Sequence, residues 1–267
     1  MFLADYHTHS LCSFDGSAPL IDLARSALRA GMDQLCLTDH CDLVSTEGKP
    51  QLTFTWEGIE EQLYLARKEF SGRLPIRMGV ELGEPWEFPD FAAQVVSHPD
   101  LDFVLGSVHN LSLAEDKGID FYYVNFKNED DCHYVLSRYF DCMERLCAMD
   151  CYDVLANVIY PLRYMNQRDG NRVTLERYLP QLEGILRTAI GKGRGMEVNT
   201  CRGETIEAWR QVLGLYRDCG GRVVTLGSDA HTADDVGRGI PQAAALLKEY
   251  GFDLAVYEKR QPQFVRL

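Results

Sequence analysis

The chain has 267 residues, of which 46% are hydrophobic and 25% are charged. This length is enough to bury one full core, and closed α/β barrels of about 250 residues often form a single domain. With 40 acidic against 27 basic residues, the formal net charge is -13. Such a surface repels phosphate backbones and anionic lipids, so we expect neither nucleic acid nor a membrane as a partner.

The N-terminal segment MFLADYHTHS has no basic region and no long apolar stretch. We therefore expect neither a signal peptide nor a membrane anchor. The chain has nine cysteines, and no two of them form a CxxC pair. This usage predicts reduced thiols in a cytoplasmic protein, in preference to a disulfide framework or a cysteine-zinc site.

Short apolar runs alternate with longer amphipathic segments along the chain. Nearly continuous runs of Val, Ile, Leu and Met predict strands that are covered on both faces, as in a parallel sheet. We expect seven such strands, at residues 2–7, 34–40, 76–82, 102–109, 153–159, 195–200 and 223–229. Apolar residues at three- and four-residue spacing predict helices near residues 20–30, 56–70, 131–149, 175–190, 205–218 and 235–250, with a shorter one at 91–97.

Seven strand–helix units in succession predict a (β/α) barrel or a doubly wound parallel sheet. No Pro-, Gly- or Ser-rich linker, composition shift or short repeat interrupts the alternation. We therefore expect a single domain that spans residues 1–267.

Histidines and carboxylates fall at the carboxyl ends of the predicted strands. His7 and His9 end the first strand, and their spacing of two points both imidazoles to one side of an extended segment. The other groups of this kind are Asp15 in the following loop and His40, Glu81, His109, Asp229 and His231 at later strand ends.

Because the carboxyl ends of barrel strands meet on one face, these groups are expected to converge there. Imidazole and carboxylate suit zinc, manganese or iron, and there are more such groups than one tetrahedral ion needs, which predicts a multinuclear centre. Each residue alone has an ordinary explanation as a hydrogen-bonded structural residue or a helix cap. A buried cluster of them is costly without a cation. His98 and His133 lie outside the pattern, and we expect both to be solvated.

The motifs at these strand ends resemble those of the polymerase and histidinol phosphatase (PHP) superfamily, in particular its stand-alone histidinol-phosphatase branch. The matching segments are His7-Thr8-His9, Thr38-Asp39-His40, Gly79-Val80-Glu81, Gly106-Ser107-Val108-His109, Glu197-Val198-Asn199-Thr200 and Gly227-Ser228-Asp229-Ala230-His231. The resemblance covers nearly the whole chain. It implies an α/β fold, a distorted TIM-like (β/α)7 barrel, with a trinuclear metal centre.

The resemblance also implies which residues hold each ion. The first ion would be held by His7, His9, Glu81 and Asp229. Glu81 would bridge to the second ion, which His109 and a further histidine would also hold. The third ion would be held by Asp15, His40 and His231.

The end of the fifth predicted strand departs from the family pattern. The further histidine closes the fifth strand in the family, whereas this chain has Asn157 there, and Ile159 stands where an acidic residue is usual. An amide oxygen is a weaker ligand than imidazole, so the second ion is expected to bind loosely to Asn157, or the centre to be dinuclear in practice.

Downstream, residues 160–164 resemble the family's substrate loop. Arg163, and Arg202 after the sixth strand, are the candidates for binding the substrate's phosphate, because a planar guanidinium grips two phosphate oxygens. The alternative for each is a solvated surface arginine.

Together these features predict a metal-dependent phosphatase for a small phosphate monoester, and the resemblance implies L-histidinol phosphate as substrate, in histidine biosynthesis. Two or three divalent ions (zinc, manganese or iron) would lower the pKa of a bridging water toward about 7 for in-line attack on phosphorus. The candidate catalytic residues are Asp229, His231 and Glu81. Asp229 or a nearby histidine would pass a proton to the leaving alkoxide. The oligomeric state does not follow from the sequence.

Several other functions stay open. A phosphoesterase of the same superfamily could act on another small ester, whereas a DNA exonuclease is disfavoured by the net charge and the lack of a basic patch. An amidohydrolase-type C–N hydrolase also uses a His-X-His motif, but it typically needs a lysine at a mid-barrel strand end, and no predicted strand ends in one. A degenerate, non-catalytic metal-binding homologue is suggested by Asn157 alone.

Overall fold

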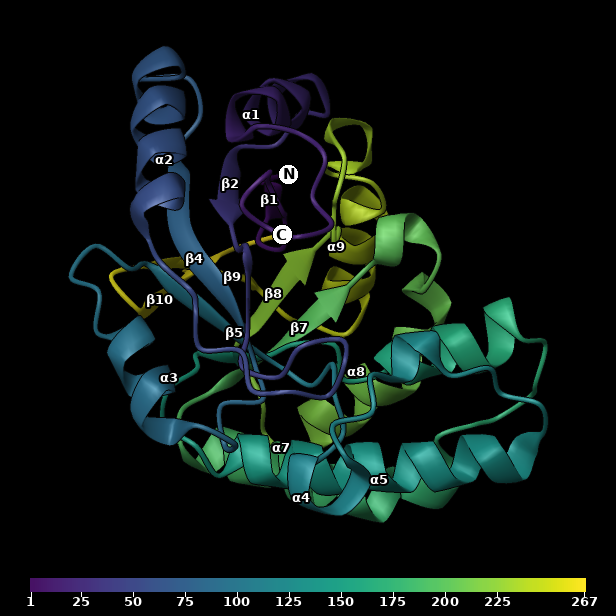
Figure 1. Cartoon of the computed structure of the whole chain (residues 1–267). Coiled ribbons are helices and arrows are strands. Elements are labelled where there is room, and N and C mark those ends of the chain that lie inside the picture. Colours follow the sequence, from purple (N-terminus) through teal and green to yellow (C-terminus); the bar gives the residue numbers. More distant parts are fainter.

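The computed structural model describes all 267 residues and shows a nearly closed barrel of parallel strands surrounded by helices (Figure 1). The strands follow the order β1-β2-β4-β5-β6-β7-β8, with β3 paired to β4 alone. Tyr6 N–H donates to the carbonyl of Leu226 (2.8 Å), which joins β1 to β8 and closes the ring. The strands are β1 Ala4–Asp5, β2 Gln34–Leu37, β3 His40–Asp42, β4 Ile76–Gly83, β5 Phe103–Ser107, β6 Val154–Leu155, β7 Gly195–Asn199 and β8 Val224–Gly227.

Helices connect successive strands, as the amphipathic segments predict. The longer ones are α1 Leu20–Arg29, α2 Glu57–Glu69, α3 Pro89–Val96, α5 Glu129–Cys147, α7 Leu179–Gly191, α8 Trp209–Asp218 and α9 Ile240–Glu249. The short ones are α4 Leu113–Asp116 and α6 Tyr160–Leu162, the latter followed by a π-helical turn at Arg163–Arg168. Turns of 3₁₀ helix lie at Phe121–Tyr123, Glu176–Tyr178, Cys201–Gly203, Ile206–Ala208 and Ala233–Asp235.

The predicted elements are all present, and their ends differ by a few residues. Helix α5 starts two residues earlier than predicted because Asn128 caps it: its Oδ1 accepts the N–H of Asp131 (2.9 Å). Three acidic residues in the first turn add to the stabilisation of this end through the helix dipole. The predicted strand at 34–40 is divided into β2 and β3 at Thr38 and Asp39, and the carboxylate of Asp39 accepts the N–H of Ser10 (2.6 Å).

The sequence-based prediction missed an antiparallel hairpin at the C-terminus. It consists of β9 Leu254–Glu258 and β10 Gln261–Val265, joined by Lys259 and Arg260 with φ values of 51° and 63°. Such two-residue turns normally contain Asn-Gly or Asp-Gly, so this Lys-Arg pair gives no hairpin signal. The backbone N–H groups of both turn residues donate to Asp102 (3.0 and 2.9 Å) at the start of β5. The hairpin therefore covers the amino-terminal end of the barrel.

The hydrophobic core is one cluster of 76 buried residues that extends from Ala4 to Tyr257. Every residue of β2, β5, β7 and β8 is buried, which confirms strands covered on both faces. All nine cysteines are free, so the structure has no disulfide, as predicted. None of the helices combines the length and apolar character needed to cross a lipid bilayer.

Candidate metal centre

Two histidines after β1 and two carboxylates from later strand ends meet at the carboxyl end of the barrel. His7 and His9 are fully buried, and their Nε2 atoms lie 3.2 and 3.5 Å from Oε2 of Glu81. Oδ1 of Asp229 lies 3.5 Å from each of the same two nitrogens. Ligand atoms held 2.0–2.1 Å from one tetrahedral ion lie about 3.3 Å apart. The spacing of these four groups therefore matches a single ion between them.

Several atoms of this group lack a hydrogen-bond partner. Nε2 of His7, Nε2 of His9 and Oε2 of Glu81 are buried and unpaired, and so is Nδ1 of His40, which lies 3.1 Å from the same Glu81 oxygen. An unpaired buried polar group costs about 1–3 kcal/mol, and more when it is charged. A divalent cation among His7, His9 and Glu81 satisfies three of these atoms at once, so the residues present fit a metal ion at this position.

In the metal-free protein, three of the four groups at this position, Glu81, Asp229 and His9, are already in the protonation state that binds a cation. Burial favours the neutral carboxyl of Glu81, but the positive charges of His7, His109 and His40 together outweigh burial and hold the pKa of Glu81 well below its ordinary value. Burial likewise opposes the charge on Asp229, but the positive charge of His7 and the other groups around Asp229 outweigh burial and hold its pKa well below the ordinary value. Burial and the positive charge of His231 hold the pKa of His9 well below its ordinary value. Both carboxylates are thus ionised and His9 is neutral.

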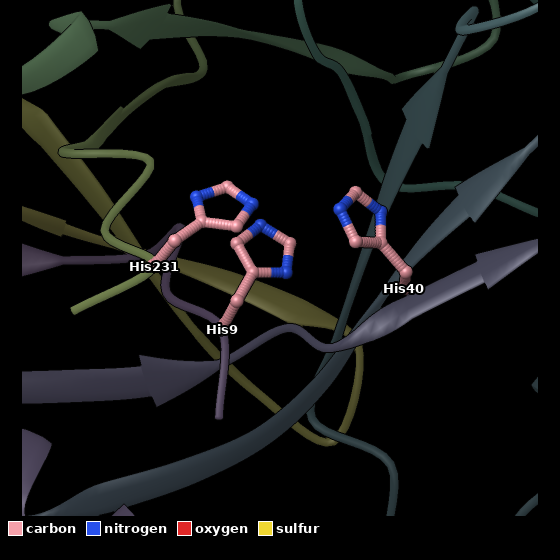
Figure 2. A group of neighbouring side chains, drawn as sticks. All are labelled: His9, His40 and His231. Carbon is pink, nitrogen blue, oxygen red and sulfur yellow. The ribbon is translucent and has the colours of Figure 1, made fainter. Parts of the chain in front are cut away.

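A second cluster lies nearer the surface. Nε2 of His231 is 3.1 Å from Oδ2 of Asp15, and Nε2 of His40 is 3.6 Å from Oδ1 of the same carboxylate. The ring of His9 stacks against both His40 and His231, with centroids 4.2 Å apart in each pair (Figure 2). Ligand atoms of the three histidines lie within 4.8 Å of one another. The structure thus brings together the residues predicted for the third ion.

His109 lies on the other side of Glu81, beside a carboxylate that sequence reasoning missed. Its Nε2 is 3.1 Å from Oε1 of Glu81, and its Nδ1 is 2.8 Å from Oδ1 of Asp42. The register of β3 on β4 pairs Asp42 with Gly83, where the Cβ of any other residue would collide with that carboxylate oxygen. A signal was present in the sequence, because Asp42 follows His40 by two residues and so shares its face of the strand.

Asn157 follows β6 and reaches the same cluster, with its Nδ2 2.7 Å from Oε1 of Glu81. Asn157 and Asp229 have positive φ values of 61° and 58°. Asparagine and aspartate adopt this conformation more readily than other non-glycine residues, and at functional sites it serves to aim a side chain. Both residues thus leave their strands with the side chain turned into the barrel mouth.

A cavity of about 820 Å³ opens over these groups. Arg163 enters it with Nη1 3.2 Å from Oδ2 of Asp229, and its guanidinium lies over the rings of Tyr160 and Tyr164, 4.1 and 4.9 Å from their centroids. Arg202 is exposed at the rim. The predicted site residues that line the cavity are Asp15, His40, Glu81, His109, Asn157, Arg163, Arg202, Asp229 and His231.

The PHP domain is the family whose sequence profile matches this chain, over residues 5–201. The chain belongs to the PHP domain family. Asp229 and His231 lie beyond the matched segment of the PHP domain, yet the barrel brings them to the same centre as His7 and His9.

Two relatives match this PHP protein over almost its whole length. The histidinol-phosphatase of Lactococcus lactis is 27% identical over 260 residues, which cover 95% of this chain and 93% of the relative. The probable histidinol-phosphatase of Thermotoga maritima is 27% identical over 271 residues, which cover 99% and 100%. These relatives are therefore similar to the whole chain, including the part outside the profile match.

Solved structures share the barrel of this PHP domain. The histidinol phosphate phosphatase from Lactococcus lactis, complexed with zinc, L-histidinol and phosphate, has a TM-score of 0.80 at 24% identity and covers 98% of each chain. The putative histidinol phosphatase from Listeria monocytogenes has a TM-score of 0.68 at 16% identity and covers 90% of this chain and 99% of its own. At these identities the likeness establishes the fold, and it confirms the distorted TIM-like barrel.

His7 and His9 turn their Nε2 atoms toward Glu81 and Asp229, and the Nδ1 atom on the other side of each ring contacts a further residue of the PHP domain. Nδ1 of His7 lies 2.6 Å from Oε1 of Glu197, a buried residue of β7. Nδ1 of His9 lies 3.1 Å from Oγ of Ser13, which donates to Asp39 (2.7 Å). A partner at Nδ1 fixes the ring and leaves Nε2 free for metal. The sequence placed Glu197 on a strand, but nothing in it showed that this carboxylate meets His7.

Glu197→Gln is expected to lower the affinity for zinc about 10- to 100-fold, because the neutral amide holds the His7 ring less firmly and makes it less basic. Chelator competition followed by titration calorimetry measures the change. Glu176→Gln, at an exposed position in a 3₁₀ turn far from the cavity, is the matched control. Equal zinc affinities for both variants would remove Glu197 from this role.

His98 and His133 stay outside the centre, as predicted. His98 lies 3.2 Å from a carboxylate oxygen of Glu60, and His133 lies 2.9 Å from the hydroxyl of Tyr178. Both are half-buried and have a side-chain partner, so they are less solvated than expected. Neither lines the cavity.

Proposed function

We propose that this PHP protein is a metal-dependent phosphatase that hydrolyses L-histidinol phosphate to L-histidinol and phosphate, a step of histidine biosynthesis. One observation carries the proposal: Glu81, whose unpaired Oε2 faces the unpaired Nε2 atoms of His7 and His9, lines the same cavity as Arg163. The substrate is supported by relatives named histidinol-phosphatase, which this chain matches from end to end.

We propose two sets of metal ligands, one for each of two divalent ions. When bound, divalent ions at this centre stabilise charge on phosphoryl oxygens and supply a nucleophilic water at neutral pH. Zinc is the metal of the Lactococcus lactis structure, and the nitrogen and oxygen donors here also accept manganese or iron. We assign one ion to His7, His9, Glu81 and Asp229. We assign another to Asp15, His40 and His231.

The chain's own residues position the phosphate and complete the proton transfer. Arg163 is the phosphate-binding residue in this proposal, since it is charged, lies beside Asp229 and is held in plane by stacking on Tyr160. Its fixed guanidinium stabilises charge on the equatorial oxygens as the ester bond breaks. Asp229 and His231 both line the cavity, and one of them is proposed to accept a proton from the attacking water and to pass it to the departing alkoxide.

The outer cavity suits the alcohol part of this substrate. L-histidinol carries an ammonium group and an imidazole. Asp120 and Glu204 place carboxylates on the cavity wall, and Phe14, Tyr122 and Tyr123 provide aromatic surface beside them. Carboxylates attract the ammonium group, and aromatic rings pack against a flat imidazole.

Arg163→Gln is expected to lower kcat/KM for histidinol phosphate about 100-fold while bound metal stays unchanged, because a charge-assisted bidentate contact to phosphate is lost. Arg202→Gln tests the second candidate arginine, at the exposed rim, where we expect a loss of less than about 10-fold. Steady-state phosphate release measures both variants. The opposite ranking would assign the phosphate to Arg202.

The alternatives predict different results in one experiment. Zinc-, manganese- and iron-loaded protein is tested for phosphate release from a panel of small monoesters, and histidinol phosphate is expected to have the highest kcat/KM. A higher value for another ester would assign this site a different substrate. No turnover at all by metal-loaded protein would favour a non-catalytic homologue. An amidohydrolase activity has little support, because no lysine lines the cavity.

We also propose that the enzyme works in the cytoplasm. Its nine free cysteines fit a reducing compartment, in which histidine biosynthesis takes place on small soluble substrates. The net charge of -13 supports the absence of a nucleic-acid or membrane partner.

A further inference from the structure

The hydrogen bonds around Asn157 fix which way its side-chain amide points. The backbone N–H of Cys201 can only donate, and it donates to Oδ1 of Asn199 (2.7 Å). Nδ2 of Asn199 therefore points the other way, and it donates to Oδ1 of Asn157 (2.8 Å) and to the Asp229 carboxylate (3.2 Å). Since its oxygen is engaged by Asn199, Asn157 presents its NH₂ group to the centre.

That NH₂ group occupies the bonding positions that a second ion would need. Nδ2 of Asn157 donates to Oε1 of Glu81 (2.7 Å), and the hydroxyl of Ser107 donates to the same oxygen (2.7 Å). A carboxylate oxygen has two lone pairs, so both lone pairs of Oε1 are engaged. Nε2 of His109 lies 3.3 Å from the same Nδ2, and its Nδ1 lies 2.8 Å from Asp42.

The two oxygens of the Glu81 carboxylate differ in whether they have hydrogen-bond partners. Around that position, Nε2 of His7, Nε2 of His9 and Oε2 of Glu81 are buried without a partner. On the opposite edge of the Glu81 carboxylate, neither Oε1 nor Nε2 of His109 is unpaired. One oxygen of Glu81 is thus arranged for a cation, and the other is already saturated by protein donors.

We propose that the side-chain amide of Asn157 takes the place of an ion between Glu81 and His109, so that this centre holds two ions and not three. The amide is a donor and carries a partial positive charge toward Glu81, which is the interaction that the carboxylate otherwise makes with a cation. Asn157 is therefore not a weak ligand, as its position in the sequence suggested, but a substitute for the ion itself. The inference rests on the proposed metal centre and is independent of the substrate.

Counting tightly bound zinc in the full-length protein tests the inference. Wild type is expected to hold two ions that survive gel filtration and competition with a chromophoric chelator, measured by elemental analysis. Asn157→His removes the amide, supplies a ring nitrogen and is expected to hold three, at a position whose positive φ histidine tolerates. Asn125→His, at an exposed loop position, adds a histidine without touching the centre and is expected to hold two.

Three tightly bound ions in wild type would overturn the inference, and so would two ions in a folded Asn157→His variant. If that variant does not fold, Asn157→Asp gives a second measurement. Its carboxylate faces Glu81 at the present 2.7 Å, so the metal-free variant is expected to melt below metal-free wild type and to recover on binding a third zinc. A variant that melts like wild type and binds two ions would contradict the proposal.

Failure of this inference and failure of the proposed function are distinguishable. The ion counts need no turnover. A protein that holds two ions as wild type and three as Asn157→His, yet releases no phosphate from histidinol phosphate, would contradict the substrate alone. A protein that hydrolyses histidinol phosphate with three ions bound would contradict this inference alone.

Discussion

Glu81→Gln is expected to lower phosphate release about 10³-fold, equivalent to about 4 kcal/mol of transition-state stabilisation, and to reduce the zinc content. Oε2 of Glu81 is the atom that the Nε2 atoms of both His7 and His9 face, at 3.2 and 3.5 Å. An amide at this position has no charge and offers only one oxygen. Because Oε1 needs to accept from Ser107 and Asn157, the amide oxygen is expected to stay there, leaving an NH₂ group toward the metal.

A matched control is needed because Glu81 is fully buried. Asp153→Asn changes another buried carboxylate to its amide at the opposite end of the barrel, where Asp153 accepts from Arg260 and from the N–H of Val104. This variant is expected to melt at a lower temperature than wild type while its zinc content stays unchanged. If Glu81→Gln kept the wild-type zinc content and rate, Glu81 would not be a metal ligand.

Removal of the divalent ions is the second change with a large expected effect. Dialysis against a chelator is expected to abolish phosphate release and to lower the Tm, and added zinc is expected to restore both. The ion stabilises the fold because it binds the native cluster and not the unfolded chain, and saturation at 100 times the Kd contributes about 2.7 kcal/mol. Differential scanning calorimetry and the phosphate assay on the same samples measure both effects.

The size of the zinc effect on Tm depends on pH in a direction that the pKa shifts predict. In the metal-free protein burial opposes the charge on His7, but Glu197 and the other carboxylates outweigh burial and hold its pKa well above the ordinary 6.5. The stability that this raised pKa provides is complete below about pH 6.5 and is lost as the pH rises through the folded pKa. Glu81 has a lowered pKa, so its contribution is lost only as the pH falls below its ordinary 4.5.

The metal-free protein should therefore be most stable between about pH 4.5 and pH 6.5 and should weaken at higher pH. Zinc binds more tightly as the pH rises, because its ligands must be deprotonated. The increase in Tm on adding zinc is expected to be larger at about pH 8 than at about pH 6. A Tm increase of the same size at both pH values, or one equally large in Glu81→Gln, would show that zinc stabilises the protein at some other place.

The sequence was sufficient for the fold and for which residues meet. The rule that parallel strands end on one face of a barrel placed His7 near His231 without any knowledge of the loops between them. The spacing of His7 and His9 fixed their common direction, since side chains alternate along an extended segment. The apolar runs were interpreted correctly as doubly covered strands because apolar residues predominate in them, although β7 carries the buried Glu197 at its centre.

The sequence does not predict which hydrogen-bond partner each polar side-chain atom has in the folded protein. The contact of Glu197 with His7 joins two strand ends and depends on side-chain rotation, which leaves no pattern along the chain. The orientation of the Asn157 amide depends on Asn199 and on the backbone N–H of Cys201, which leave no pattern in the sequence; the role that we propose for Asn157 therefore differs from the one predicted. The hairpin was missed because its turn uses Lys259 and Arg260 where glycine or asparagine is usual.

The C-terminal hairpin determines at which end of the barrel ligands can enter and leave. Tyr257 of β9 packs against Phe103 of β5, with ring centroids 4.8 Å apart, and the hydroxyl of Tyr6 donates to its carbonyl, so aromatic side chains plug the barrel at its amino-terminal end. The cavity opens at the other end, over the proposed metal ligands. Substrate must enter, and both products must leave, through this one mouth. In the proposed reaction the alcohol part of the ester lies toward this mouth, so we expect the alcohol to leave before the phosphate.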